Sequence, residues 1–460
     1  MDDVENVMEK IVSLAKRRGF VFPSSEIYGG FAAVYDYGPL GVELGNNVKQ
    51  LWWKSMVHER EDIFGLDSAI FMSPKVWEAS GHVGGFSDPL TECKKCHTRS
   101  RIDHLLEEVD VFADEKMSEE EINKIFFDNV DRIDCPKCGG HDFTEAKSFN
   151  LLVQSNLGNF TGDWTKEPVY LRGETAQGIY VNFKNVVDSM RARVPFGIAQ
   201  IGKAFRNEIT ARQFIFRTRE FEQMELQYFV HPDGAKESYE EWKERRMKFY
   251  LALGVNPEHL RWHEHENLVF YATEAYDIEY KFPFGWKELE GLHARGDYDL
   301  SVHAKASGQK LEFVDQQKNE KFVPHIVETS AGVARNMLMM MVEAYTEEKV
   351  GDDTRIVMKF PASLAPYKIA ILPLSKKEEL IGPSREIFKT LSKIYHCDFD
   401  ITQSIGKRYR RQDEIGTPYC VTVDFDSLED KAVTVRDRDS MKQERIKIED
   451  LQEYFTKKLS

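Results

Sequence analysis

The sequence lacks several features that would assign it quickly to a class. No run of about 18 apolar residues is present, so we expect no membrane-spanning segment. Neither of two glycine-rich phosphate loops occurs, G-x-x-x-x-G-K-[ST] or a G-x-G-x-x-G that opens a helix. Internal repeats and low-complexity tracts are also missing, which excludes a solenoid and a tail-rich scaffold.

Basic residues are fewer than acidic ones, 62 Lys and Arg against 77 Asp and Glu. The net charge of −15 argues against a protein that binds nucleic acid without specificity, because such proteins are basic overall. It leaves room for a nucleic-acid partner held by a local basic patch. The 460 residues, 42% hydrophobic and 30% charged, have ordinary globular composition and predict two or three domains.

The N-terminal stretch, MDDVENVMEKIVSLAKRRGF, has apolar residues at helical spacing: Val4, Val7, Met8, Ile11 and Leu14. This spacing predicts an amphipathic helix, and the acidic start is unlike a signal peptide. We therefore expect a cytoplasmic protein.

Cysteine is scarce, and most of it is paired. Cys93 and Cys96 form one CxxC, and Cys135 and Cys138 form another that Gly-Gly follows. In a cytoplasmic chain two such turns are typical of four thiolates around a structural Zn²⁺. Free or redox-active cysteines are the alternative, although a redox motif would need one CxxC on a βαβ unit. Two further cysteines are expected in the core, Cys397 and Cys420.

Between Phe20 and Ala362 short strand-like runs alternate with glycine-rich turns and a few helices. Strands joined by short turns, with helices clustered, predict an α+β fold: an antiparallel sheet flanked by helices. Helices are expected at 42–57 and at 332–345, the second buried because it is apolar nearly all round.

A separate C-terminal α/β domain of about 95 residues is predicted after a linker that Pro361 and Pro366 punctuate. Its stretch GKRYRRQ gathers positive charge around an aromatic residue: Lys407, Arg408, Tyr409, Arg410 and Arg411. We interpret this as a basic loop that could contact a phosphate backbone; a solvated surface loop is the alternative.

One hairpin carries unexpected charge. The stretch FRNEITARQFIFRTREFEQMELQYF alternates like two strands, yet one predicted face is polar: Arg206, Glu208, Arg217, Phe221 and Glu225. Guanidinium groups hold phosphate oxygens, a carboxylate can accept from an adenine amino group, and a Phe ring can stack on a base. The hairpin is therefore predicted to hold ATP on a sheet; a solvated hairpin with surface ion pairs is the alternative.

The same stretch resembles motif 2 of the class II aminoacyl-tRNA synthetases. ETSAGVARNMLMMMVEAY resembles motif 3, with Gly332 and Arg335, and DYGPLGVELGNNVKQLWWKSMV resembles motif 1, with Pro39. SGHVGGFSDPL, LRGETAQGIYVNF, REFEQMELQYFV and GWKELEGLHARGDYDL are similar to the glycyl-tRNA synthetases of the dimeric, single-polypeptide type. The resemblance covers essentially the whole chain.

The resemblance implies four segments. Residues 1–92 hold the first part of the catalytic domain, 93–149 an insertion with the cysteine pairs, 150–362 the rest of the catalytic domain, and 363–460 an anticodon-binding domain. It also implies a homodimer through motif 1, and tRNA(Gly), glycine, ATP and Mg²⁺ as partners.

The implied reaction has two steps, formation of glycyl-adenylate from glycine and ATP, and transfer of glycyl to tRNA. Neither step needs a protein nucleophile, and catalysis would rest on positioning and electrostatics. The resemblance makes Arg206 and Arg335 catalytic. It assigns to ATP Arg206, Asn207, Glu208, Phe216, Arg217, Thr218, Arg219, Glu220, Phe221, Glu288, Leu289, Gly332, Val333, Ala334 and Arg335.

For glycine the resemblance implies an acidic pocket around the ammonium group. The implied residues are Arg101, Glu174, Phe221, Glu222, Gln223, Met224, Glu225, Glu328, Thr329, Ser330, Ala331 and Gly332. Arg99 is an alternative to Arg101. The chain departs from the usual pattern at Gly173 and Thr329, where the family has Pro. Steric exclusion of larger amino acids would need no editing domain, and none is visible.

Two rival interpretations remain. A synthetase-like protein could serve as a non-catalytic accessory that binds nucleic acid, but the arginines of motifs 2 and 3 are present. A sister synthetase for another amino acid is the second rival.

Overall fold

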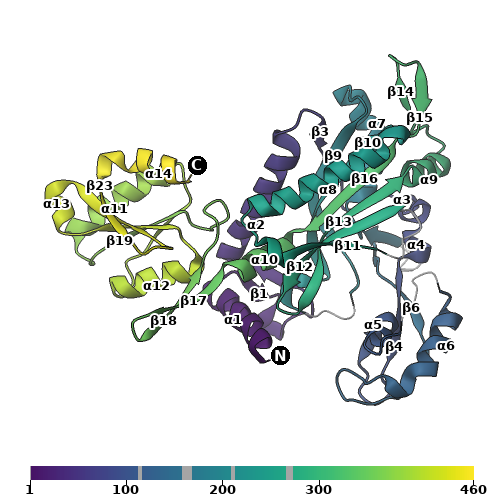
Figure 1. Ribbon diagram of the computed structural model, residues 1–460, viewed down its shortest axis with the longest axis horizontal. Helices are drawn as coiled ribbons and strands as arrows, with labels where there is room; N and C mark the ends of the chain where they lie inside the picture. Colours follow the sequence, from purple (N-terminus) through teal and green to yellow (C-terminus); the bar gives the residue numbers. More distant parts are fainter. Residues whose placement is uncertain (1, 112–116, 158–167, 209–212, 266–272, 460) are drawn as a thin grey trace.

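The computed structural model describes residues 2–111, 117–157, 168–208, 213–265 and 273–459. Figure 1 shows a central body, a small lobe formed by the insertion, and a C-terminal lobe on the other side. In the described part of the chain no helix is long and apolar enough to cross a membrane.

The body is built on a seven-stranded sheet with the order β11-β12-β13-β16-β10-β9-β3. All neighbours are antiparallel except β3 and β9, which confirms the predicted α+β class. Its strands are β3 (Ile63–Gly65), β9 (Phe196–Phe205), β10 (Glu220–Val230), β11 (Leu260–Glu264), β12 (Glu274–Phe282), β13 (Gly285–Gly296) and β16 (His325–Gly332).

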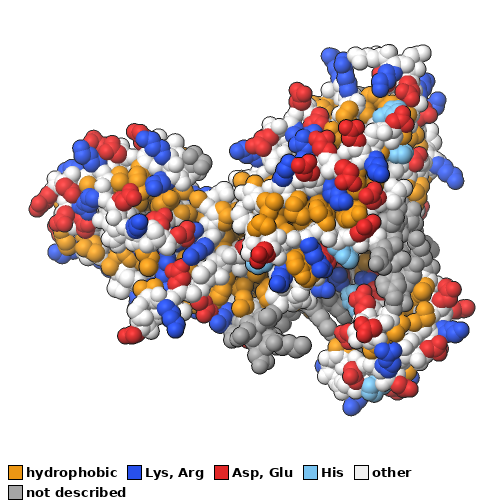
Figure 2. Space-filling view, viewed as in Figure 1, with side chains coloured by type: hydrophobic (Ala, Val, Ile, Leu, Met, Phe, Trp, Pro, Cys, Tyr) orange, Lys and Arg blue, Asp and Glu red, His pale blue; other side chains and the backbone are white. Residues whose placement is uncertain are grey.

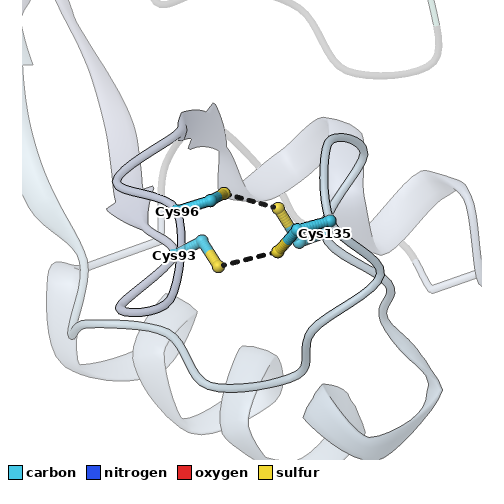
Figure 3. Close-up of side chains that lie close together, drawn as sticks. Cys93, Cys96 and Cys135 are labelled. Carbon is cyan, nitrogen blue, oxygen red and sulfur yellow. Dashed lines mark hydrogen bonds between the residues drawn. The ribbon is translucent and has the colours of Figure 1, made fainter.

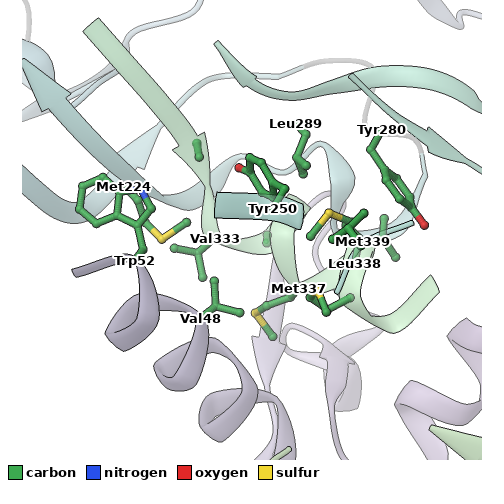
Figure 4. Close-up of a cluster of buried hydrophobic side chains, with 14 of the residues drawn as sticks. Val48, Trp52, Met224, Tyr250, Tyr280, Leu289, Val333, Met337, Leu338 and Met339 are labelled. Carbon is green, nitrogen blue, oxygen red and sulfur yellow. The ribbon is translucent and has the colours of Figure 1, made fainter. Parts of the chain in front are cut away.

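One face of this sheet packs on the main hydrophobic core. Three helices cover it: α2 (Pro39–Trp53), α8 (Ala235–Ala252) and α10 (Val333–Ala344). Figure 4 shows Val48 and Trp52 of α2 meeting Val333 and Met337 of α10 under the strands. The two helices predicted at 42–57 and 332–345 are confirmed, and α10 is almost wholly buried.

The other face of the sheet is only partly covered by helices. At one end α7 (Ala176–Met190) and α9 (Tyr298–Ser307) cover a smaller aromatic core. The N-terminal helix α1 (Asp2–Arg18) is formed as predicted. Short elements complete the body: β1 (Val21–Pro23), η1 (Glu26–Tyr28), β2 (Tyr35–Tyr37), η2 (Lys54–His58), α3 (Pro74–Ala79), α4 (His82–Gly85), β7 (Val153–Asn156), β8 (Pro168–Leu171), η4 (Phe214–Phe216), η5 (Pro232–Gly234), η6 (Pro257–His259), β14 (Phe313–Asp315) and β15 (Glu320–Phe322).

The insertion has a three-stranded sheet with the order β5-β4-β6 and its own core. Ser118 begins its longest helix with a capping box, because its hydroxyl accepts from the Glu121 backbone N–H while the Glu121 carboxylate accepts from the Ser118 N–H. The elements are β4 (Ser87–Glu92), β5 (Arg99–Arg101), α5 (Ile102–Glu107), α6 (Glu119–Asn129), η3 (Val130–Arg132) and β6 (Lys147–Asn150).

The C-terminal domain is a five-stranded mixed sheet with the order β20-β19-β21-β22-β23. A hairpin leads into it, β17 (Tyr345–Val350) and β18 (Asp353–Met358). Its elements are β19 (Ile369–Pro373), α11 (Glu378–Leu391), β20 (Cys397–Phe399), α12 (Ile405–Ile415), β21 (Tyr419–Val423), α13 (Asp426–Asp430), β22 (Ala432–Asp437), β23 (Gln443–Lys447), η7 (Ile448–Asp450) and α14 (Leu451–Leu459).

The prediction that GKRYRRQ forms a basic loop is wrong, because these residues lie in helix α12. Arg408 is 2% exposed and donates to the carbonyl oxygens of Pro373 and Asp400. Arg411 pairs with the carboxylate of Asp400. Two of the four basic side chains therefore stabilise the domain internally. Figure 2 shows acidic and basic side chains interspersed over the visible face of this lobe.

Candidate functional site

A cavity of ≈ 250 Å³ opens on the uncovered part of the sheet face that α7 and α9 leave free. It brings together side chains from three strands, β10, β13 and β16, from the start of α10 and from the connecting segments. Its lining includes Glu174, Arg206, Glu208, Phe216, Arg217, Thr218, Phe221, Glu222, Gln223, Glu225, Glu288, Gly291, His293, Glu328, Ser330, Gly332, Ala334 and Arg335.

The alternation of β10 creates this face. Phe221, Gln223 and Glu225 point into the cavity, whereas Met224 and Leu226 belong to the core on the opposite side. The prediction of a hairpin with a polar face is confirmed for β10. It is wrong in one detail, since β9 ends before Arg206 and Glu208, which line the cavity from beyond the strand.

Three carboxylates form one end of the cavity: Glu174, Glu225 and Glu328. The Gln227 amide links two of them, donating to Glu225 over 3.1 Å and to Glu328 over 2.7 Å. The Thr175 hydroxyl also donates to Glu225. These donors hold the acids in place without neutralising them.

Cations and imidazoles offset part of the negative charge. Arg295, 3% exposed, donates to Glu328 over 3.0 Å, and His293 Nδ1 lies 3.0 Å from the other oxygen of that carboxylate. Burial alone would raise the pKa of Glu328, but Arg295 and His293 outweigh it and hold the pKa low. Glu174 is likewise held ionised, its pKa lowered chiefly by His82 against the effect of burial.

Glu225 differs from its two neighbours. Burial raises its pKa well above the usual range, and the negative charges of Glu328 and Glu174 raise it further. Glu225 therefore ionises less readily than Glu174 and Glu328. The oxygens of the three side chains can accept hydrogen bonds from a small ammonium ion.

The other end of the cavity holds guanidinium groups against aromatic rings. The Arg206 guanidinium lies 5.5 Å from the centre of the Phe221 ring. The Arg335 guanidinium lies 4.5 Å from the Phe216 ring and pairs with Glu288 over 2.9 Å. These planar cations and rings can hold phosphate oxygens and a flat base.

A β-bulge directs Glu288 into the cavity. The register of β12 and β13 shifts so that Glu279 faces Glu288 and Ile278 faces Glu290, which leaves Leu289 as an extra residue. Glu290 therefore points to the opposite face. There Arg246 donates to it over 2.5 and 3.0 Å.

This buried Arg246–Glu290 pair lies directly behind the site. The Tyr250 hydroxyl donates to Glu290 over 2.6 Å, and the Thr329 hydroxyl donates to it as well. Thr329 is the residue between Glu328 and Ser330 of the cavity wall. The pair thus ties β13 and β16 to α8, and this supports the register of the strands that carry the site.

Some predicted residues have side chains outside the cavity. Met224, Leu289, Ala331 and Val333 lie in the core, and Thr329 faces Glu290. Glu220 pairs with Lys203, and Arg219 donates to the carbonyl oxygen of Glu208. The Asn207 backbone N–H donates to Leu151. None of these residues lines the cavity.

Arg101 lines a neighbouring cavity with Arg217, Lys287 and His104. It pairs with Asp88 over 2.9 Å. Arg99, the alternative, lies on the exposed side of the insertion, where it pairs with Glu92. Arg101 is the one of the two that faces the central body.

Sequence reasoning missed several residues that contact the site: His82, Phe86, His293 and Arg295. Because side chains alternate between the two faces of a strand, the sequence of β13 after its bulge could have placed His293 and Arg295 on the cavity side. His82 and Phe86 lie in the stretch SGHVGGFSDPL, which resembles the family, but nothing local to that stretch shows that their side chains contact the site.

Cys93, Cys96, Cys135 and Cys138 meet in the insertion, and Figure 3 labels the first three. Their sulfur atoms lie within 4.8 Å of one another, with 3.6 Å between Cys93 and Cys138 and between Cys96 and Cys135. A tetrahedron with Zn–S bonds of about 2.3 Å has edges of roughly 3.8 Å. The four thiols therefore fit Zn²⁺.

Comparison with known proteins gives consistent matches. Residues 160–345 match the family "tRNA synthetase class II core domain (G, H, P, S and T)", and residues 368–458 match "Anticodon binding domain". The chain is 53% identical to a glycine–tRNA ligase of Clostridium acetobutylicum over 99% of both chains. It is 52% identical to that of Treponema denticola over 97% of this chain and 96% of the relative.

A solved structure shares the fold. A prolyl-tRNA synthetase from Cryptosporidium parvum, complexed with L-proline and AMP, superposes with a TM-score of 0.62. The match covers 98% of this chain and 77% of that one at 15% identity.

Replacing Glu225 by Gln tests the charge state of the acidic end. The folded chain holds a proton on Glu225 that the unfolded chain loses above the ordinary pKa of 4.5, so this group makes the protein less stable as pH rises. Gln mimics the protonated acid. Thermal unfolding should therefore show that the stability of Glu225→Gln relative to wild type increases as the pH is raised above about 5.

The matched control is Glu240→Gln, which changes an exposed carboxylate on α8 and should leave the pH dependence unchanged. A stability difference for Glu225→Gln that is constant with pH, or that shrinks as pH rises, would contradict the assignment.

Proposed function

The chain belongs to the glycine–tRNA ligase family of class II synthetases, and from this membership we propose which residues of the cavity perform the reaction. The enzyme activates glycine with ATP to glycyl-adenylate and transfers the glycyl group to tRNA(Gly). The observation that carries the assignment of the site is the meeting, in one cavity, of an acidic end and an end with stacked guanidinium groups. A non-catalytic accessory role is not favoured, because the three arginines that motifs 2 and 3 supply all line this cavity.

The acidic end is proposed to receive the ammonium group of glycine. Glu174 and Glu328 supply negative charge, and Glu225 supplies hydrogen-bonding oxygens. Gln223 and Ser330, joined by a 3.3 Å hydrogen bond, lie on the same face. A side chain on the substrate would have to enter this packed wall, so selection for glycine would be steric.

The other end is proposed to receive ATP. Arg206 would hold the α-phosphate and the glycine carboxylate, bringing the nucleophile to phosphorus. Phe221 would stack under the adenine, and Glu208 would accept from its amino group. Arg335 would cover the base and reach the γ-phosphate, with Arg217 supporting the triphosphate.

Magnesium would act beside Glu288. This carboxylate is half-exposed and faces the cavity, and it is the hard oxygen ligand that Mg²⁺ prefers. Partial burial would raise its pKa, but Arg335 outweighs this and lowers the pKa to about 2, so Glu288 is available as an anion. The metal, when bound, would neutralise phosphate charge.

Removing the Arg206 guanidinium tests the catalytic assignment. Arg206→Ala should lower glycine-dependent ATP–pyrophosphate exchange by at least about 100-fold, the scale of losing one donor to the transition state. Arg245→Ala, on the exposed side of α8, should retain wild-type exchange. The same assay with alanine and serine should give little exchange in the wild type.

Near-normal exchange by Arg206→Ala would contradict its role. Activation of alanine or serine as efficiently as glycine would contradict the steric pocket.

The cysteine cluster is proposed to bind structural Zn²⁺, since four protein ligands leave no position for substrate. Cys135→Ser should lower the zinc content of the purified chain to well below one equivalent and make the insertion sensitive to protease, because metal binding stabilises such small modules. Cys420→Ala, in the C-terminal core, should keep its zinc. A wild type purified without zinc, or a Cys135→Ser variant with full zinc, would contradict the proposal.

A second copy of the chain is proposed to cover the region before α2. Ile27 is 89% exposed, Tyr28 86% and Phe31 58%, an unusual concentration of large apolar side chains on one short segment. Motif 1 continues directly from it into α2. Such a surface is typical of an obligate interface.

Sedimentation of the full chain at micromolar concentration should give a dimer, and Ile27→Asp should shift it toward the monomer mass of 53.4 kDa. Val314→Asp, which changes an apolar residue exposed on the distant β14, should not. Wild type that sediments as a monomer would count against the interface.

Two further assignments complete the proposal. The C-terminal domain would bind the anticodon of tRNA(Gly), as its family description suggests. The cytoplasm is the proposed location, because a site of four thiolates persists where thiols stay reduced.

A further inference from the structure

A short segment ahead of the insertion contacts both ends of the cavity. It runs from Ser80 to Phe86 and joins α3 to β4. The cavity lining does not include it, and the stretch SGHVGGFSDPL, which begins at Ser80, entered the sequence analysis only as a resemblance, without a role for any of its side chains. Its two ring-bearing side chains point to different places, His82 to the acidic end and Phe86 to the nucleotide end.

His82 contacts the acidic end through Glu174. Its Nε2 lies 3.4 Å from the Glu174 carboxylate, and its Nδ1 lies 2.8 Å from the Ser80 hydroxyl. The imidazole also packs edge-on against Trp77 at 5.3 Å between centroids. Trp77 is fully buried, so the ring that contacts Glu174 has a fixed orientation.

Phe86 contacts the nucleotide end through Arg206. The guanidinium lies 5.1 Å from the centre of the Phe86 ring, closer than it lies to Phe221. Arg206 Nε donates to the carbonyl oxygen of Gly173 over 3.1 Å. A Cβ at Gly173 would lie 3.2 Å from the Phe86 ring, so this position leaves space for the ring.

The segment is anchored to the base of the insertion. The Asn150 amide donates to the carbonyl oxygens of His82 and Val83 over 3.2 and 2.9 Å. The Leu151 N–H donates to the Phe86 carbonyl over 2.9 Å, and Leu151 in turn accepts from the Asn207 N–H over 2.8 Å. Backbone hydrogen bonds thus run from the segment to the residue that follows Arg206.

We propose that Ser80–Phe86 is a positioning segment that sets both substrate subsites: His82 orients Glu174 toward the ammonium of glycine, and Phe86 holds Arg206 against the phosphate. This inference rests on the proposed function of the cavity. Neither side chain reacts with substrate, and each acts through the residue that it contacts.

The two contacts predict different kinetic effects. Glu174 would bind the ammonium equally in the ground state and the transition state, so losing His82 should raise the KM for glycine. Arg206 would act on charge that develops at phosphorus, so losing Phe86 should lower kcat.

The test measures ATP–pyrophosphate exchange with the full-length chain. His82→Phe keeps the aromatic packing but removes the hydrogen bond, and should raise the glycine KM roughly tenfold or more with kcat and the ATP KM nearly unchanged. Phe86→Leu keeps an apolar side chain without a ring, and should lower kcat roughly tenfold with the glycine KM nearly unchanged.

Conservative variants and a control separate positioning from folding. His82→Gln, whose amide can donate to Glu174, should recover most of the glycine affinity, and Phe86→Tyr should recover kcat. Gly84→Ala lies in the same segment with open space at its Cβ, so it should behave as wild type. Thermal shift on addition of glycine gives a binding readout that does not depend on turnover.

The outcomes are distinguishable. A wild type without glycine-dependent exchange would overturn the proposed function itself. An active wild type would overturn the positioning role if His82→Phe and Phe86→Leu left both constants unchanged, or if both variants altered kcat and glycine KM in the same proportion. Failure of His82→Gln and Phe86→Tyr to recover activity while they remain folded would overturn it as well.

Discussion

The antiparallel pairing of β10 with β16 is the constraint on which the site depends. It places Glu225 opposite Ser330 and Gln227 opposite Glu328, so the acids and their amide partner converge from two strands. A slip of one residue would turn Met224 and Leu226 into the cavity and the carboxylates into the core. The deep apolar packing of the opposite face makes such a slip costly. The core therefore specifies where the charges lie.

The site also concentrates negative charge where water is scarce. Three acidic side chains in one cavity are tolerated because Arg295, His293 and His82 contact two of them and the raised pKa of Glu225 disfavours a third negative charge. Repulsion among the acidic groups makes the protein without substrate less stable. A cationic group that enters the cavity would relieve the repulsion, which is how a binding site can be less stable than its surroundings and still be well ordered.

Local patterns allowed much of this to be predicted from the sequence. The period of β10, the apolar character of α10 and the two CxxC turns each follow from neighbouring residues, and the structure contains all three. The error at GKRYRRQ, which was predicted to be a basic loop, has a physical reason. Arg408 and Arg411 bind groups within the domain, and composition alone cannot distinguish a buried arginine from an exposed one. His82 and Phe86 were missed because their contacts with the site depend on how distant segments pack together. Which atoms of the cavity contact glycine and ATP stays a prediction.

The bulge at Leu289 affects how relatives of this chain should be compared. Glu288 and Glu290 are the same residue type two positions apart, yet one lies on the ligand side and the other in the scaffold. An alignment that shifts a gap by a residue or two here would exchange a cavity residue for a member of a structural ion pair without any change of letter. Homologous positions in this strand are therefore better assigned by the face on which each side chain lies than by counting along the chain.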